Sequence, residues 1–275
     1  HVYYYYGDLI HSSADLLLFP YLVLTSGHAL LLSKDMQSGI VFEKQDTLKF
    51  FHQMYDRYLE QVSSFGVVMN NLPTQLSYFH NIRADMEQNY CFQMLPCLTF
   101  GIPDYFFDKY IYPEIPSRDK LIAMLMDYVH SIRKRFTEHP VRFIFSEDGL
   151  QRFLETGRIP EYPPAVYRPF ELSDRIVLIR QFLKFCPPNG LCMLKCTIGD
   201  LDNELFMYVN PRNGYLMFPS SEPDQLICLD ITEPGLLHGF CDFCEHLDKD
   251  LFYTETEAYS LISSLLDKTE QKKGS

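Results

Sequence analysis

The sequence predicts an α+β fold, and three observations lead to this prediction. Apolar residues recur at three- and four-residue steps in several stretches, as at Leu121, Leu125 and Val129, which indicates helices. Other short apolar runs lie between turns rich in Gly, Pro and Asn, which indicates strands. The order of these patterns predicts a mixed α/β N-terminal part, followed by a helix, a four-stranded antiparallel meander and two C-terminal helices.

Residues 1–158 are expected to form an α/β domain. Its predicted strands are apolar runs bounded by turn-forming residues, at 21–24, 29–32, 39–42, 90–95 and 141–145. Its predicted helices carry their apolar residues on one face, or follow a proline or a capping residue, at 47–62, after Pro73, at 104–110, at 117–136 and at 150–155.

A connector is predicted at 159–170, because the prolines there favour an extended backbone: Pro160, Pro163, Pro164 and Pro169. Residues 171–275 are then a second domain that begins with a helix over 173–186. Four short strands joined by brief turns should form the antiparallel meander, at 191–197, 204–209, 215–219 and 225–229.

Two helices close the chain. The first runs from 234 to about 249, and the second begins with Thr254-x-x-Glu257, the sequence of a capping box.

The composition is that of a folded, acidic protein. Of 275 residues, 47% are hydrophobic and 22% are charged, which excludes disordered and collagen-like chains. The 36 Asp and Glu exceed the 24 Lys and Arg, which gives a net charge of −12. Such a chain repels a phosphate backbone, so we expect no direct nucleic-acid contact by this chain. Arg133-Lys134-Arg135 is better explained as the end of a helix, where cations complement the helix dipole.

The longest apolar run and the cysteines indicate a cytoplasmic protein. The run, 16–24, has about half of the ~18 residues that cross a bilayer, so we expect no membrane contact. Eight cysteines in a chain of this length are too sparse for a disulfide scaffold, and most of them lie in apolar runs. We therefore expect free, buried thiols.

The stretch His238-x-x-Cys241-x-x-Cys244-x-His246 has residue types that bind zinc. Four ligands this close together on one helix cannot surround a tetrahedral ion, and the two cysteines share a stripe with Leu237. We expect buried thiols here, with no bound metal and no cofactor.

Two groups of polar residues are candidates for ligand binding. Ser146 and Glu147 follow a predicted strand, at the end where α/β sheets bind ligands. The alternative is that Ser146 caps the next helix, with Glu147 close to its positive end. His80 and Arg83, in the segment after Pro73, form the second group.

No catalytic residue is assigned. The glycine-rich phosphate-binding motifs, the nucleophile elbow and the zinc-protease motif are all absent from the sequence. Cys97 or Cys192 remains an alternative as a thiol nucleophile, which would require a histidine from elsewhere in the chain.

Three tracts, 20–65, 145–159 and 240–257, resemble the C-terminal effector regions of some bacterial helix-turn-helix transcriptional regulators. The resemblance covers about a third of the chain and implies a sensing or protein-contact module whose DNA-binding domain lies upstream of this chain. It supplies no site residue.

We therefore expect a non-catalytic regulatory domain that binds a small molecule or a partner protein. A dimer or another homo-oligomer is compatible with this function. The alternative is a hydrolase or transferase with a noncanonical site, such as a cysteine-based one.

Overall fold

The computed structural model describes residues 3–4, 19, 21–60, 63–64, 67–198, 205–219 and 226–273. The chain divides into two compact units, residues 1–65 and 66–275, and each is described by itself. Helices and strands occur in both units, which confirms the α+β class.

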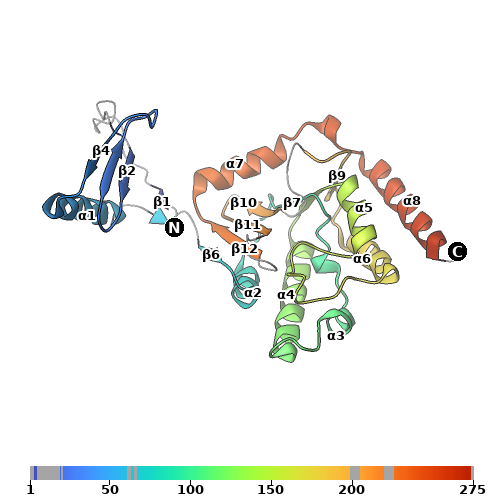
Figure 1. Ribbon diagram of the computed structural model, residues 1–275. Coiled ribbons are helices and arrows are strands. Elements are labelled where there is room, and N and C mark those ends of the chain that lie inside the picture. The colour runs from blue at the N-terminus through green and yellow to red at the C-terminus, as the bar shows by residue number, and fades with distance from the viewer. Residues whose placement is uncertain are drawn as a thin grey trace. The chain divides into compact units, whose positions relative to one another are not determined.

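The smaller unit is a three-stranded antiparallel sheet with one helix (Figure 1). The sheet contains β2 (Tyr21–Leu24), β3 (Ala29–Leu32) and β4 (Gly39–Phe42), in that order, and α1 (Gln45–Leu59) follows. A further pair of short strands joins β1 (Tyr3–Tyr4) to β5 (Ser63–Ser64). Only three apolar side chains of the described part are buried in this unit: Ala29, Leu48 and Phe51.

The larger unit is built on a seven-stranded mixed sheet of order β6-β12-β11-β10-β7-β8-β9. The strands are β6 (Val68–Met69), β7 (Tyr90–Gln93), β8 (Arg142–Ser146), β9 (Leu191–Leu194), β10 (Phe206–Asn210), β11 (Asn213–Pro219) and β12 (Leu226–Ile231). β7, β8 and β9 are parallel to one another, while the other pairs are antiparallel. The sheet therefore has an antiparallel half and a parallel half, which meet where β10 pairs with β7.

The predicted four-stranded meander is wrong in one strand. β10, β11 and β12 pair consecutively, as expected from their short turns. β9 instead pairs in parallel with β8, and β7 and β8 lie between it and β10. The crossovers through α4 (Arg118–Glu138), and then through α5 (Glu147–Thr156) and α6 (Leu172–Phe185), place β8 and β9 in parallel beside β7.

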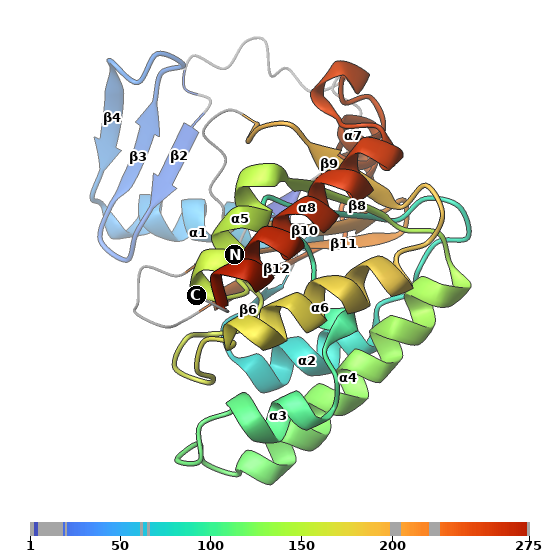
Figure 2. The same ribbon diagram turned by 90° about the vertical axis from the view of Figure 1, so that its right-hand side faces the viewer.

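Helices cover both faces of this sheet. They are α2 (Leu72–Asn81), α3 (Tyr105–Tyr110), α4 (Arg118–Glu138), α5 (Glu147–Thr156), α6 (Leu172–Phe185), α7 (Pro234–Glu245) and α8 (Glu255–Lys273), with short 3-10 helices η2 (Thr99–Gly101) and η3 (Lys249–Leu251). α7 packs on one face, and the other α-helices share the cluster on the opposite face (Figures 1 and 2).

The two faces follow from the alternation of side chains along the strands. In β8, Phe143 and Phe145 belong to the large aromatic cluster, and Ile144 between them belongs to the cluster under α7. Phe143 lies within the aromatic cluster, where its ring contacts those of Phe100, Phe136 and Phe182.

The boundary between the compact units lies at 65/66, and the predicted connector at 159–170 does not separate them. The segment belongs to the larger unit, where the Tyr112 amide donates to the Val166 carbonyl and the Arg168 amide donates to the Tyr110 carbonyl. Its prolines do make it irregular, but Ile159, Tyr162, Tyr167 and Phe170 are buried.

The two arginines of the basic triplet contact the protein's own backbone. Arg133 donates to the carbonyls of Phe100 and Ile102, and Arg135 donates to that of Phe79. These bonds tie α4 to η2 and α2. Across the described residues, every helix is too short or too polar to span a lipid bilayer.

Candidate functional site

The carboxyl end of β8 is shaped by Ser146 and Gly149. Ser146 is fully buried, and its hydroxyl accepts from the Gly149 amide at 3.0 Å and donates to the Met94 carbonyl at 3.2 Å. A Cβ on Gly149 would lie 1.8 Å from that same carbonyl oxygen, so only glycine allows α5 to begin here. The capping function foreseen for Ser146 is confirmed.

Glu147 is the first residue of α5 and joins it to the C-terminal part of the chain. Its carboxylate accepts from the Tyr253 hydroxyl at 2.6 Å and from the Gln151 amide at 3.1 Å. The hydrogen bond to this carboxylate raises the pKa of Tyr253, since it favours the protonated phenol. Glu147 is thus fixed in orientation at the side of a groove.

That groove runs between α5 and α8, which lie next to each other in Figure 2. One part has a volume of about 640 Å³ and is lined by residues that include Glu147, Gln151, Tyr253, Ser260, Ser264 and Lys268. The adjoining part, of about 590 Å³, shares Gln151, Leu265 and Lys268 with the first and extends to Leu172 on α6. We call the two parts together the α5–α8 groove.

The start of α8 is fixed by the capping box expected from the sequence. Glu257 accepts from the Thr254 amide at 2.8 Å, and the Glu257 amide donates to the Thr254 hydroxyl at 3.3 Å. The backbone hydrogen bond from Thr254 lowers the pKa of Glu257, so its carboxylate stays ionised at the groove.

The groove is lined by more carboxylates than cations. Glu147, Glu155 and Glu257 contribute to its lining, and Lys268 is the one cation among the lining residues. An excess of negative charge in a concave surface favours positively charged ligands.

The second predicted pair, His80 and Arg83, does not lie at the carboxyl ends of the parallel strands. The Arg83 carbonyl accepts from the Asn210 amide, close to the amino end of β7, whereas Ser146 lies at the carboxyl end of β8. His80 Nδ1 lies 3.3 Å from a carboxylate oxygen of Asp127, beside a small hollow of about 210 Å³. The structure therefore does not bring His80 and Arg83 together with Ser146 and Glu147.

The cysteine and histidine residues of α7 separate on the two sides of the helix. Cys241 and Cys244 are buried beneath α7, as expected, while His238 and His246 are exposed. Burial raises the pKa of Cys241 to about 11 and that of Cys244 to about 12. In the described ranges, no three His, Cys, Asp or Glu side chains are grouped so that they could hold a metal.

Of the residues that line the groove, the sequence pointed to Glu147 on α5 and not to those on α8. Glu147 was visible as the polar residue after a strand, but its partner Tyr253 lies 106 positions further along the chain. Ser260, Ser264 and Lys268 are ordinary polar residues of an amphipathic helix, and nothing local distinguishes them. Their spacing on one face of α8 was the only available signal.

No protein-family model, curated protein or solved structure gives a significant match to this chain.

Proposed function

We propose that this chain is the non-catalytic regulatory domain of a bacterial transcriptional regulator and that it senses a small ligand in the α5–α8 groove. The observation that carries the proposal is the position of the groove. It lies beside the carboxyl end of β8, where open α/β sheets bind ligands, and hydrogen-bonding side chains from two helices line it.

The charge of the lining favours a ligand that carries an amine. Glu147 and Glu257 lie on the wall nearest the helix N-termini, and Ser260 and Ser264 supply hydroxyls along α8. A small amine would find carboxylate acceptors at one end and neutral hydrogen-bonding groups along the groove.

The non-catalytic assignment is supported by the properties of one candidate thiol, that of Cys97. Cys97, one of the two cysteines considered as a nucleophile, is buried, and its hydrogen bond with Cys91 raises its pKa. A thiol that resists ionisation is a weak nucleophile. The alternative of a cysteine-based hydrolase or transferase therefore gains no support from Cys97.

The regulatory assignment is supported by the resemblance to effector regions and by the acidic charge of the chain, which disfavours contact with DNA by this part. A ligand bound between α5 and α8 would contact both helices and so stabilise one arrangement of them. A partner protein or a second copy of the chain could read that change.

The test is ligand binding by the wild-type chain and two matched variants. Ser263 and Ser264 are adjacent exposed residues of α8, but only Ser264 lines the groove. Ser264→Phe should block the groove, and Ser263→Phe is the control of equal size and composition. The probes are two panels, one of free amino acids and diamines and one of dicarboxylates and sugar phosphates.

We expect an amine of the first panel to raise the Tm of the wild type and of Ser263→Phe by about 5 °C or more at 100 times its Kd. Ser264→Phe should lose this shift. Binding of an anion while all amines are inert would refute the ligand class. Absence of any binding that depends on Ser264 would refute sensing in this groove.

A further inference from the structure

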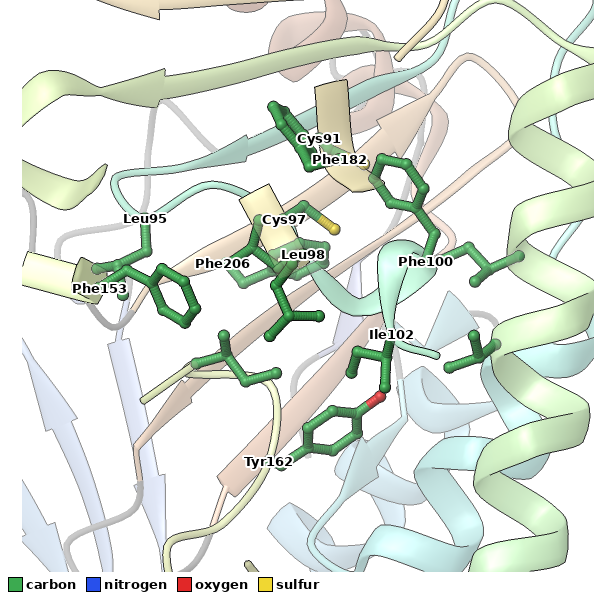
Figure 3. Packing of buried hydrophobic residues seen from close by; sticks show 14 of the residues in the cluster. Cys91, Leu95, Cys97, Leu98, Phe100, Ile102, Phe153, Tyr162, Phe182 and Phe206 are labelled. Atoms are coloured by element: carbon green, nitrogen blue, oxygen red, sulfur yellow. The ribbon is translucent and has the colours of Figure 1, made fainter. Parts of the chain in front are cut away.

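A cluster of buried polar side chains outside the groove remains without a function. It contains Gln93 at the end of β7, Thr99 in η2, and Glu161 and Tyr162 from the 159–170 segment. All four are buried, with exposed fractions between 1% and 7%. Figure 3 shows Tyr162 and Cys97 in the surrounding apolar cluster, near Leu98 and Ile102.

This cluster is poor in hydrogen bonds. The Thr99 hydroxyl donates to Glu161 Oε1 at 3.3 Å. Among the side chains that the structure describes, Glu161 Oε2, both polar atoms of Gln93 and the Tyr162 hydroxyl are buried without a hydrogen-bond partner. Buried polar atoms are nearly always paired in folded proteins, so a group of four in one place calls for a physical explanation.

Protonation of Glu161 changes the hydrogen bonds that this cluster can form. A carboxylate held in apolar surroundings is costly, and burial raises the pKa of Glu161 to about 7, although the side chains of Gln93, Thr99 and Cys97 act in the opposite direction. A protonated carboxyl can donate to the Gln93 side-chain oxygen, whereas a carboxylate can only accept, as from the Gln93 side-chain NH2. The protonated carboxyl of Glu161 thus favours the observed packing of its side chain in the core, and the carboxylate disfavours it.

The titratable groups that face Glu161 are neutral ones. They come from the segment after β7, from α4 and from the 159–170 segment itself: Cys97, Tyr128, Tyr162 and Tyr167. The Cys91 hydrogen bond raises the pKa of Cys97, and burial raises the pKa of the three tyrosines, that of Tyr167 to about 12. Glu161 is therefore the group of this cluster that changes charge near neutral pH.

Only the first part of the 159–170 segment depends on Glu161. Residues 166–168 are held by backbone hydrogen bonds to residues 110–112. Ile159 is tied to the Tyr167 hydroxyl, which accepts from its amide at 2.8 Å and donates to its carbonyl at 3.0 Å. Between these attachments, Glu161, Tyr162 and Pro163 are buried, and the charged Arg158 side chain donates to the Pro164 carbonyl at 3.4 Å.

We propose that the protonation state of Glu161 controls the packing of residues 160–165, and we call this arrangement a latch. When Glu161 is protonated, residues 160–165 pack against the carboxyl end of β7. When Glu161 releases its proton to solvent, this part of the segment opens. The device is independent of the α5–α8 groove. It makes the packing of the 159–170 segment responsive to pH near neutrality.

The test is hydrogen exchange of the backbone amides of Glu161, Tyr162 and Ala165 in the full chain, since the other residues of 160–165 are prolines. It is expressed as protection factors so that the intrinsic effect of pH is removed. If the open segment restores the ordinary acidity of Glu161, its opening constant should rise roughly 30-fold between pH 5.5 and pH 8.5. Glu161→Gln should keep the segment protected at both pH values. Glu114→Gln, at an exposed glutamate, should behave as the wild type.

The wild-type comparison requires no variant and stands even if Glu161→Gln folds poorly. Equal protection of the Glu161, Tyr162 and Ala165 amides at the two pH values would overturn the latch. So would a pH dependence that persists in Glu161→Gln. Residues 142–146 of β8 serve as the internal reference and should stay protected throughout.

Discussion

The two units of this chain are built from similar residues but differ in how they bury them. Of the thirteen large apolar side chains that are exposed among the described residues, eight belong to the small unit, among them Val41 and Tyr58, and five to the large one. The large unit has two apolar clusters, one on each face of its sheet. A sheet of three strands with a single helix has too little volume to enclose its apolar residues, as surface-to-volume scaling requires.

The difference also extends to polar residues. Every fully buried polar side chain of the described residues lies in the large unit, including Gln93, Ser146 and Glu161. A large core can surround such groups, and it can hold them in positions where their chemistry is altered. Exposed apolar side chains are thus concentrated in the small unit, and buried polar side chains in the large unit.

The largest effect should come from Phe143→Ala in the large unit. Phe143 is fully buried and contacts three other rings, so its removal should lower the free energy of unfolding by about 3–5 kcal/mol. Phe51→Ala, in the small unit, should cost less, because Phe51 is 8% exposed in a cluster of three buried residues that can collapse around the lost ring.

Urea denaturation together with hydrogen exchange of peptides from each unit would measure both variants. Each substitution should reduce protection only in its own unit. If Phe143→Ala also removed protection from α1, the two units would unfold as one, and the comparison would fail.

The next effect concerns pH and the interior of the large unit. The pKa of Glu161 is raised to about 7, so between its usual value and pH 7 the folded state binds more protons than the unfolded state. Stability should therefore fall as the pH rises through this window, by about 3 kcal/mol in total. Glu161→Gln should remove this loss and be more stable than the wild type at pH 8.

Chemical denaturation at pH 4, 6 and 8 would check this expectation. Wild type and Glu161→Gln should have similar stability at pH 4, where the carboxyl is protonated in both the folded and the unfolded state. A difference that is the same at all three pH values would show that titration of Glu161 is not the cause.

The smallest effect concerns the face of the sheet that α7 covers. Cys244 is fully buried among apolar neighbours, so Cys244→Ser should lower stability by about 1–3 kcal/mol through an unpaired hydroxyl. Cys244→Ala should lose less.

With native protein, a thiol reagent should label the exposed Cys196 well before Cys241 or Cys244. Rapid labelling of Cys244 would place α7 away from the sheet.

Local patterns predicted the elements of this fold better than their arrangement. The helix over 117–136 and the strand over 141–145 were readable because their apolar spacing is a property of a single segment. The β10-β11-β12 meander was readable because short turns force neighbouring strands to pair. The place of β9 was not readable, since its partner β8 is separated from it by α5 and α6.

The same limit applies to the sites. Ser146 could be assigned as a cap from its position between a strand and a helix, and Glu147 as a polar residue at the strand end. The contact of Glu147 with Tyr253 depends on how α8 folds back on α5. The approach of Glu161 to Thr99 depends on the packing of a proline-rich segment that composition alone suggested was a loose connector.

The junction of the two half-sheets has a consequence for the synthesis of the chain. β7 is buried on both faces and pairs with β8 on one side and β10 on the other. β10 is translated after β8 and β9, so a nascent chain that already contains the parallel half still presents a bare, apolar edge along β7. Such an edge invites pairing with other chains. Emergence of β10 from the ribosome is therefore the step that covers the β7 edge, and a pause in translation shortly before it would prolong the interval in which this edge is open to other chains.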